Sequence, residues 1–263
     1  SECLVGSEMC IRDRGERFGF YIMMAILTLF ISAKFGLSET TTGYIYSAFY
    51  ASIYILALAG GIIADKTKNF KGTILAGLVL MAVGYLIIAI PTPTPVPSMA
   101  LYLTLTCFGL LVIAFGNGLF KGNLQALVGQ MYDNPVYSNL RDAGFQIFYM
   151  FINIGGFFAP FIAIGVRNWW LKVNNFDYDA TLPELCHQYI NHIDSGAEMP
   201  AQAMENLTTL SNSVILDGQA VTDLHAFANS YLDVFNRGFQ YAFMAAIAVS
   251  YTHLRAHETL ANL

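Results

Sequence analysis

Five long apolar segments constrain this chain more than any other feature. A helix needs about 20 consecutive apolar residues to cross the hydrocarbon core of a bilayer. The segments cover residues 16–35, 43–64, 73–90, 99–130 and 143–166, and a sixth begins near residue 237. Hydrophobic residues make up 56% of the chain and charged residues only 12%, which does not describe a soluble domain of this size. We therefore expect an all-α transmembrane fold in a lipid bilayer.

The first segment begins with two charged residues, Glu16 and Arg17. Its uncharged part, residues 18–33, is too short to cross a bilayer alone, so both residues are expected at membrane depth. A charge there costs about 2.5–3.5 kcal/mol on insertion scales, and it persists when it is paired or faces a watery interior. Glu16 and Arg17 are therefore candidate functional residues. The alternative is that both reach the headgroups from the helix end, as Lys34 is expected to do at the other end.

Polar side chains recur along one face of three later segments, because residues three or four apart share a face of a helix. They are Tyr46, Tyr50 and Tyr54 in the second segment, Asn117, Lys121 and Gln125 in the fourth, and Gln146, Tyr149, Asn153 and Gly156 in the fifth. The three tyrosines indicate either aromatic packing between helices or the wall of a polar cavity. In the fourth segment, Gly118 and Gly122 have a spacing that lets a neighbouring helix approach closely.

The distribution of lysine predicts the orientation of the chain in the membrane. Lysine and arginine favour the cytoplasmic side in short loops. Lys66, Lys68 and Lys71 follow the second segment and therefore place that turn inside, together with the N-terminus. Residues 168–236 are then outside. The net charge of the chain is −5, its acidic residues cluster in this late region, and no nucleic-acid partner is expected.

Residues 168–236 are too long for a structureless connection. Apolar residues at helical spacing predict an amphipathic helix from Leu182 to Ile193, opened by a capping box of Thr181 and Glu184. A second helix is predicted from Leu224 and runs into the sixth segment. We therefore expect a small extracellular helical insert.

Neither the histidines nor the cysteines form a pattern that predicts a metal site. His187, His192 and His225 lie in the insert without other metal-ligand residues at a suitable spacing. The four cysteines have no disulfide or metal-binding spacing. Residues 1–14 and 250–263 do not continue the surrounding pattern and are expected to be non-native, adapter-like tails. The expected organisation is a tail (1–14), spans one to five (15–167), the insert (168–236), the start of span six (237–249) and a second tail (250–263).

Four motifs in order resemble the proton-dependent oligopeptide transporter family of the major facilitator superfamily. The run Glu16-Arg17-Phe18-Gly19-Phe20-Tyr21 is similar to the second half of the family's first-helix signature, E-x-x-E-R-F-x-Y-Y. The other three motifs are Gly60-Gly61-Ile62-Ile63-Ala64-Asp65, Gly116-Asn117-Gly118-Leu119-Phe120-Lys121 and Phe148-Tyr149-Met150-Phe151-Ile152-Asn153-Ile154-Gly155. The resemblance covers residues 15–249 and implies the N-terminal six-helix half of a major facilitator fold, with five complete spans and the start of a sixth.

This chain departs from the family pattern at several positions. Met24 stands where many peptide-transporting members have an arginine, Gly122 replaces a proline after the lysine, and Gly156 replaces a serine. The first glutamate of the signature would fall at Asp13, inside the expected tail, and no role is carried over to it. Without an arginine at Met24, the two-cation grip on a peptide carboxylate is reduced to Lys121.

The resemblance implies a proton-coupled symporter that imports di- and tripeptides by alternating access. Lys121 would bind the peptide carboxylate, and Tyr21, Tyr54 and Asn153 would form a hydrogen-bonding wall. Glu16 would carry the proton beside Arg17 and Lys121. No cofactor is implied, and protons are the coupling ion. The implied partners are small peptides, protons, the bilayer and a C-terminal half of the same transporter.

Other functions remain to be weighed against peptide import. A transporter of the same family that moves another small anion or metabolite, such as nitrate, is the main alternative because of Met24. A membrane enzyme would show paired ligands or a nucleophile with its base, and the spans contain none. A membrane scaffold would not need Glu16, Arg17 and Lys121 at bilayer depth. The expected location is the plasma membrane, here a bacterial inner membrane, with several passes and a cytoplasmic N-terminus.

Overall fold

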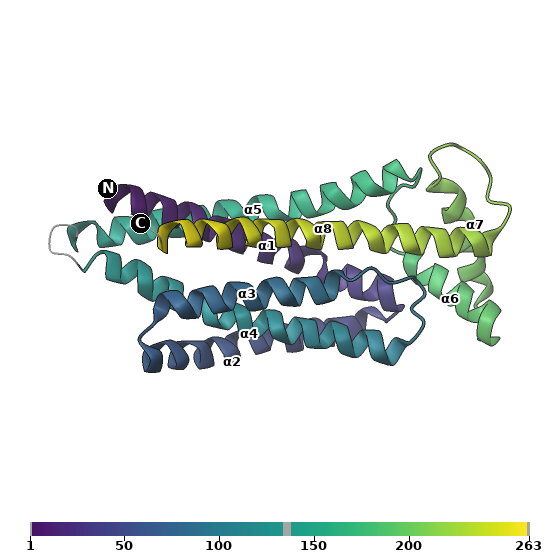
Figure 1. Cartoon of the computed structure of the whole chain (residues 1–263). Coiled ribbons are helices and arrows are strands. Elements are labelled where there is room, and N and C mark those ends of the chain that lie inside the picture. Colours follow the sequence, from purple (N-terminus) through teal and green to yellow (C-terminus); the bar gives the residue numbers. More distant parts are fainter. Residues whose placement is uncertain (1, 134–137, 262–263) are drawn as a thin grey trace.

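The computed structural model describes the backbone of residues 2–133 and 138–261, and this backbone is almost entirely helical (Figure 1). Side chains are described for residues 19–126, 128–130, 132–133, 138–150, 152–244 and 247. The helices are α1 (Glu2–Phe35), α2 (Glu39–Thr67), α3 (Phe70–Ala89), α4 (Met99–Met131), α5 (Arg141–Val173), α6 (Leu182–Ser195), α7 (Ala201–Ser213) and α8 (Leu224–Ala261). A 3₁₀ turn, η1 (Ser138–Leu140), precedes α5. The prediction of an all-α fold is confirmed.

Four helices within the described residues are long and apolar enough to cross a membrane. They are Glu39–Thr67, Phe70–Ala89, Met99–Gln130 and Ser138–Val173. In α1 the described side chains begin at Gly19, and the apolar stretch among them is Gly19–Phe35. The second to fifth apolar segments are therefore confirmed as helices of membrane-crossing length, and α5 continues beyond its predicted end at residue 166 to Val173.

The end of α2 and the start of α3 are capped by adjacent residues, so the turn between them is tight. The residue after α2, Lys68, adopts a left-handed conformation with φ of 51°, and its N–H donates to the carbonyl of Ala64. The next residue, Asn69, caps α3 by accepting a 3.0 Å hydrogen bond from the N–H of Gly72. The two helices are consequently antiparallel neighbours with almost no connection between them.

The helices pack as two groups of three. One group consists of α2, α3 and α4, and the other of α1, α5 and α8 (Figure 1). Contacts between α3 and α8 and between α1 and α2 join the two groups. The fully buried side chains include Phe30 from α1 and Phe239 and Phe243 from α8, whose rings meet edge to face. Aromatic packing therefore holds α1 against α8.

Glycines allow the backbone of α4 to touch the backbones of α2 and α3. A Cβ atom on Gly118 would lie 2.5 Å from the carbonyl oxygen of Leu56 on α2, and one on Gly60 would overlap the carbonyl of Gly118. On the other side of α4, a Cβ on Gly116 would lie 2.7 Å from the carbonyl oxygen of Gly77 on α3. The expected close approach is therefore confirmed at Gly118.

The same expectation is wrong at Gly122. This glycine is exposed, and a Cβ atom added to it would have no neighbouring atom within 4 Å. Spacing alone places both glycines near one face, but Gly122 points away from α2, whereas the next residue, Asn123, still contacts α2 by donating a 3.3 Å hydrogen bond to the carbonyl of Gly60. A sequence pattern of this kind cannot show which of its small residues lie in the contact.

Residues 174–223 form the connection that contains α6 and α7, and two details of its predicted structure are wrong. Thr181 does not cap α6 through its side chain; instead Asp179 Oδ1 accepts hydrogen bonds from the N–H groups of Thr181 and Leu182, at 2.8 and 2.9 Å. A carboxylate is the stronger acceptor at a helix N-terminus, which explains the substitution of one cap for the other. The prediction also missed α7, which buries few side chains, Leu207 among them. The predicted helix from Leu224 is confirmed as the start of α8.

Two cations near the connection that contains α6 and α7 are buried. Lys34 was expected to reach the headgroups, but its side chain is only 3% exposed and its Nζ lies 5.2 Å from the ring centroid of Phe30. The prediction was wrong because α6 and α8 pack around the end of α1. Arg167, also 3% exposed, places its guanidinium 3.7 Å from the ring centroid of Tyr178. Both cations lie against aromatic rings, where such contacts are favourable.

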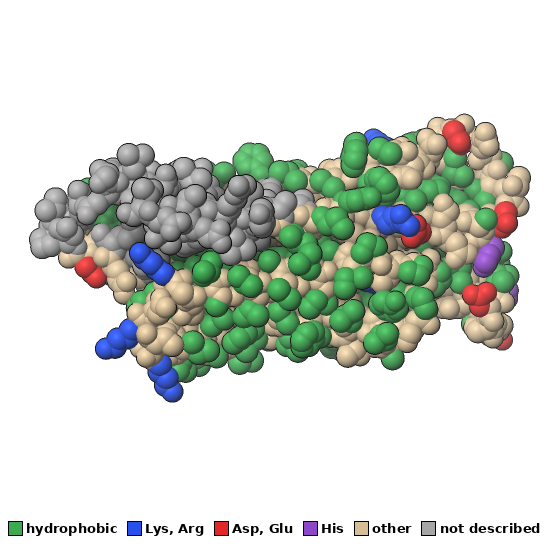
Figure 2. Space-filling view, viewed as in Figure 1, with side chains coloured by type: hydrophobic (Ala, Val, Ile, Leu, Met, Phe, Trp, Pro, Cys, Tyr) green, Lys and Arg blue, Asp and Glu red, His purple; other side chains and the backbone are tan. Residues whose placement is uncertain are grey.

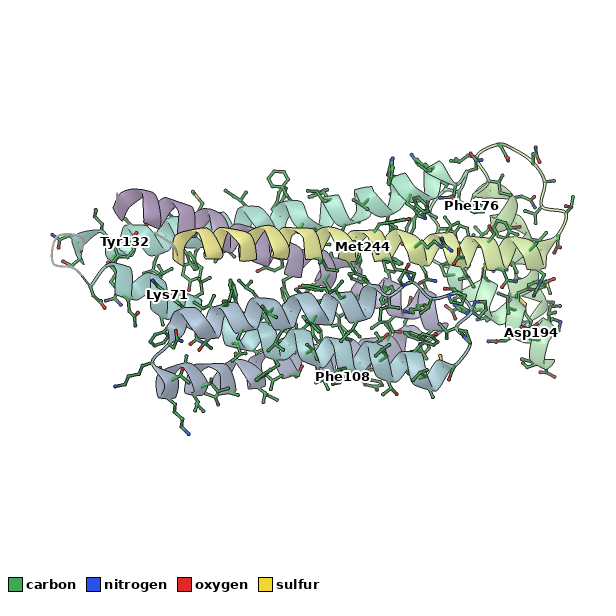
Figure 3. All side chains as sticks on the ribbon, viewed as in Figure 1. Lys71, Phe108, Tyr132, Phe176, Asp194 and Met244 are labelled. Atoms are coloured by element: carbon green, nitrogen blue, oxygen red, sulfur yellow. The ribbon has the colours of Figure 1, made fainter. Side chains whose placement is uncertain are left out.

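The two ends of the molecule differ in charge. Exposed lysines project where α2 meets α3, and acidic side chains gather around α6 and α7 at the opposite end (Figure 2). Figure 3 places Lys71 at the first end and Phe176 and Asp194 at the second. The long axis of the helices therefore runs from a basic end to an acidic end.

We predict that Gly118→Ala destabilises the chain whereas Gly122→Ala does not. The first methyl group would meet the carbonyl of Leu56, and overpacking of this kind costs about 1–3 kcal/mol. The second enters open space, where alanine is the better helix former by up to about 1 kcal/mol. Thermal unfolding of the full chain in detergent measures both. Equal midpoints for the two variants would show that α2 and α4 are not in backbone contact at Gly118.

Candidate functional site

Lys121 projects from α4 one turn beyond the glycine contact with α2. Its Nζ lies 5.1 Å from the ring centroid of Tyr54 on α2, and its side chain is partly exposed. A cation at this distance over an aromatic ring is attracted to the ring face. Among the side chains that the structure describes, no carboxylate forms an ion pair with Lys121. The ammonium group therefore remains available to an anion from outside the described residues.

The three tyrosines of α2 share one face, as predicted. The rings of Tyr46 and Tyr50 are stacked, with centroids 6.2 Å apart, and those of Tyr50 and Tyr54 meet edge to face at 5.3 Å. The hydroxyl groups of Tyr50 and Tyr54 share a 3.0 Å hydrogen bond. Both of these side chains are exposed, at 44% and 55%. The row is therefore a continuous phenol surface that ends beneath Lys121 and is not buried between helices.

Gln125, one turn beyond Lys121, connects the two helix groups. Its Nε2 donates a 3.1 Å hydrogen bond to the hydroxyl oxygen of Tyr149 on α5. The polar residues predicted to share one face of α4 have different neighbours. Asn117 is buried against Met81 of α3, whereas Gln125 reaches α5. The sequence indicated both stripes but not the hydrogen bond between them, since the relative rotation of α4 and α5 is a tertiary property.

The polar face of α5 lies in an open groove of about 700 Å³. The groove is lined by Phe145, Gln146, Tyr149, Met150, Asn153, Ile154, Phe157 and Phe158. The expected shared face of Gln146, Tyr149 and Asn153 is therefore confirmed. Most of the lining is apolar with a few polar groups, which is the usual composition of a small-molecule site.

Tyr21 of α1 meets α5 one turn beyond Asn153. A Cβ atom on Gly156 would lie 3.3 Å from Cε2 of the Tyr21 ring, so glycine at this position admits the ring. Met24 is partly buried and packs against the hydrophobic core. Tyr21 and Asn153 therefore belong to neighbouring turns of two packed helices, while Met24 contributes no polar group.

The side chains of Glu16 and Arg17 lie outside the described residues. The backbone there is part of α1, which continues from Glu2 to Phe35. Their expected roles in proton coupling stay predictions. Within the described residues, no group of three or more His, Cys, Asp or Glu side chains is placed to hold a metal ion.

Comparison with known proteins relates part of the chain to one family. The POT family matches residues 71–179, which include α4 with Lys121 and α5 with Asn153. Dipeptide and tripeptide permease A from Cronobacter turicensis is 36% identical over 146 residues, and the protein of the same name from Escherichia coli K12 is 33% identical over 144 residues. Each alignment covers 55% of this chain and 27% of the relative, so the chain spans about a quarter of the length of these curated relatives.

Over this part, the chain is similar to the POT family. Its fold agrees with solved POT structures. Tetrameric PepTSo2 superimposes with a TM-score of 0.62 over 99% of this chain and 40% of that chain, at 23% identity. A mutant peptide transporter POT in complex with sulfate gives 0.53 over 77% and 42%, at 26% identity. This similarity supports the expectation of a multi-pass membrane transporter over that of an enzyme.

Proposed function

We propose that this chain belongs to the POT family and forms the N-terminal half of a proton-coupled symporter that imports di- and tripeptides by alternating access. Five spans, α1 to α5, and the membrane part of α8 would make up a six-helix half of a major facilitator fold. The relatives named as dipeptide and tripeptide permeases support this substrate class. The observation that carries the proposal is the position of Lys121, a lysine within an apolar helix whose ammonium lies over Tyr54.

A dipeptide is a zwitterion, and the site offers groups suited to its carboxylate end. Lys121 supplies a cation, and a charge-assisted hydrogen bond to a carboxylate is roughly twice as strong as a neutral one. Tyr54 lies directly beside the ammonium, and Tyr21 and Asn153 add polar groups on α1 and α5. The apolar groove on α5 leaves room for variable side chains. A complete site would need a group for the amino end, which we assign to a C-terminal half.

Proton coupling is assigned to Glu16, with Arg17 and Lys121 as its charged neighbours. A desolvated carboxylate exchanges a salt-bridge partner for a proton as a cavity opens and closes, because burial favours its neutral form and a cation favours its charged form. When Glu16 is protonated, Lys121 is released to hold the substrate. A Glu16→Gln variant that retains gradient-driven uptake would assign this carboxylate a structural role instead.

A second function within the family is favoured by one position, Met24. It is partly buried and apolar, so the site has one cation fewer than a two-cation grip on a peptide carboxylate would require. A small anion or metabolite such as nitrate needs only one cation. Competition between labelled dipeptides and small anions distinguishes the two functions.

The charge at the two ends supports an orientation. We propose that the basic turn between α2 and α3 is cytoplasmic, together with the N-terminus, and that residues 168–236 form an extracellular insert. The insert contains no arginine and one lysine, Lys172, which agrees with an outside location. The host membrane would be a bacterial inner membrane, since the similar permeases come from bacteria.

We predict that Lys121→Ala strongly reduces uptake of labelled dipeptide driven by a pH gradient in the complete transporter that contains this chain. Loss of one charge-assisted bond costs about 1.5–3 kcal/mol, which is a reduction of about tenfold or more. Lys172→Ala, at an exposed lysine far from the site, is the matched control and should transport normally. Normal uptake by Lys121→Ala would remove Lys121 from the mechanism.

The orientation predicts which residues react from outside the cell. A cysteine placed in the insert at Glu198 should react with a membrane-impermeant maleimide on intact cells, because the insert faces the medium. A cysteine at Lys68 should react only after the membrane is permeabilised. The opposite pattern would reverse the topology.

A further inference from the structure

Two buried side chains from different helices reach the same carbonyl at the end of α1. The imidazole Nε2 of His187 on α6 lies 2.7 Å from the carbonyl oxygen of Ala33, and Nδ2 of Asn236 on α8 donates to the same oxygen at 3.2 Å. Ala33 belongs to the last turn of α1, where helix carbonyls lack intrahelical partners. The contact to Ala33 requires His187 Nε2 to be the donor. His187 and Asn236 thus tie α6 and α8 to the end of α1.

The imidazole of His187 also packs closely against Gly36 at the end of α1. Gly36 ends α1 in a left-handed conformation with φ of 61°. A Cβ atom at this position would lie 2.8 Å from Cγ and 3.1 Å from Nδ1 of His187, so only glycine admits the ring here. His187 is 8% exposed. The second ring nitrogen, Nδ1, therefore lies beside the backbone of Gly36.

No acidic group compensates a positive charge on this ring. Among the described side chains, no carboxylate lies within ion-pair distance of His187. The buried ionisable side chains on the elements that meet here are Lys34 on α1, Cys186 on α6 and Tyr231 on α8. Glu184, one turn before His187 on α6, is exposed and accepts a 3.2 Å hydrogen bond from Gln188. Farther along α8, Asp233 is engaged with Arg237 at 2.8 Å. A proton added to His187 would consequently be buried without a counter-ion.

Burial lowers the pKa of His187 below its ordinary value of 6.5, although the hydrogen bond to Ala33 acts in the opposite direction. The state with α6 docked on α1 therefore binds a proton less readily than an undocked state. As the pH falls below about 6.5, the undocked state takes up the proton first. Docking is strongest above this pH and weakens as the medium becomes acidic.

We propose that His187 is a pH-sensitive latch: its neutral imidazole fastens α6 to the end of α1, and protonation releases it. Asn236 keeps α8 attached to Ala33, so release affects the α6 side of the junction. The latch itself does not depend on the proposed transport function. The consequence of the latch for transport does rest on the proposed function. With the insert outside, the external acid that drives uptake would also loosen the outer end of α1, the helix that carries Glu16 and Tyr21.

Cys186 reports on the latch because it precedes His187 in α6 and is fully buried. Burial raises the pKa of its thiol to about 12. The experiment uses the full chain in detergent with Cys3, Cys10 and Cys107 replaced by serine. Reaction with 2,2′-dithiodipyridine, which modifies thiols in acid as well as at neutral pH, is followed between pH 7.5 and 5, and each rate is divided by that of a free thiol.

We expect the relative rate to rise as the pH falls, by up to about tenfold for each unit by which burial lowers the histidine pKa. His187→Gln keeps an amide donor for Ala33 but cannot take up a proton, so its rate should not change with pH. His192→Gln, which alters another histidine of the same helix, should behave like the parent. A flat profile in the parent, a rise that persists in His187→Gln, or no reaction of Cys186 at any pH would each overturn the latch. An absence of transport by the complete protein would not overturn the latch, since the labelling of Cys186 does not depend on transport.

Discussion

The backbone contact of α4 with α2 and α3 is the constraint on which the rest of the structure depends. Gly118 lies against the carbonyl of Leu56, and Gly116 lies against that of Gly77, so side chains larger than hydrogen are excluded on both sides of α4. This contact fixes the rotation of α4 about its axis. Lys121, three residues beyond Gly118, must then project beside Tyr54. The position of the candidate binding cation is thus a consequence of helix packing through glycines, to which Asn117 and Asn123 add contacts with Met81 and with the carbonyl of Gly60.

Much of the helical framework could be predicted from the sequence, because hydropathy reports directly on burial in lipid. The tyrosine face of α2 and the polar face of α5 were also predictable, since the helical period places residues four apart together. The burial of Lys34 and the existence of α7 were not. Lys34 is buried because α6 and α8 cover the end of α1, and α7 has too few apolar residues to show a periodic pattern.

Candidate site residues could be named from the sequence, but their partners could not. The hydrogen bond from Gln125 to Tyr149 and the contact of Tyr21 with Gly156 each depend on how two helices are rotated against one another. His187 had no visible role, because its partner is a backbone carbonyl, which carries no sequence signal. The same reasoning gives the connection after α5 a defined place in the fold: it is tied to α1 by His187 and to α5 by the contact of Arg167 with Tyr178.

The central claim is that the face around Lys121 binds a substrate carboxylate. Competition binding to the complete transporter with matched dipeptides and dipeptide amides tests it most directly, in the native protein and in Met24→Arg. Met24 lies two turns beyond Arg17 on α1, and we propose that a guanidinium added there reaches the same carboxylate. The account predicts that the acid binds more tightly than the amide, and that Met24→Arg widens the difference by about 1–3 kcal/mol. Equal affinity for acid and amide in both proteins would contradict it.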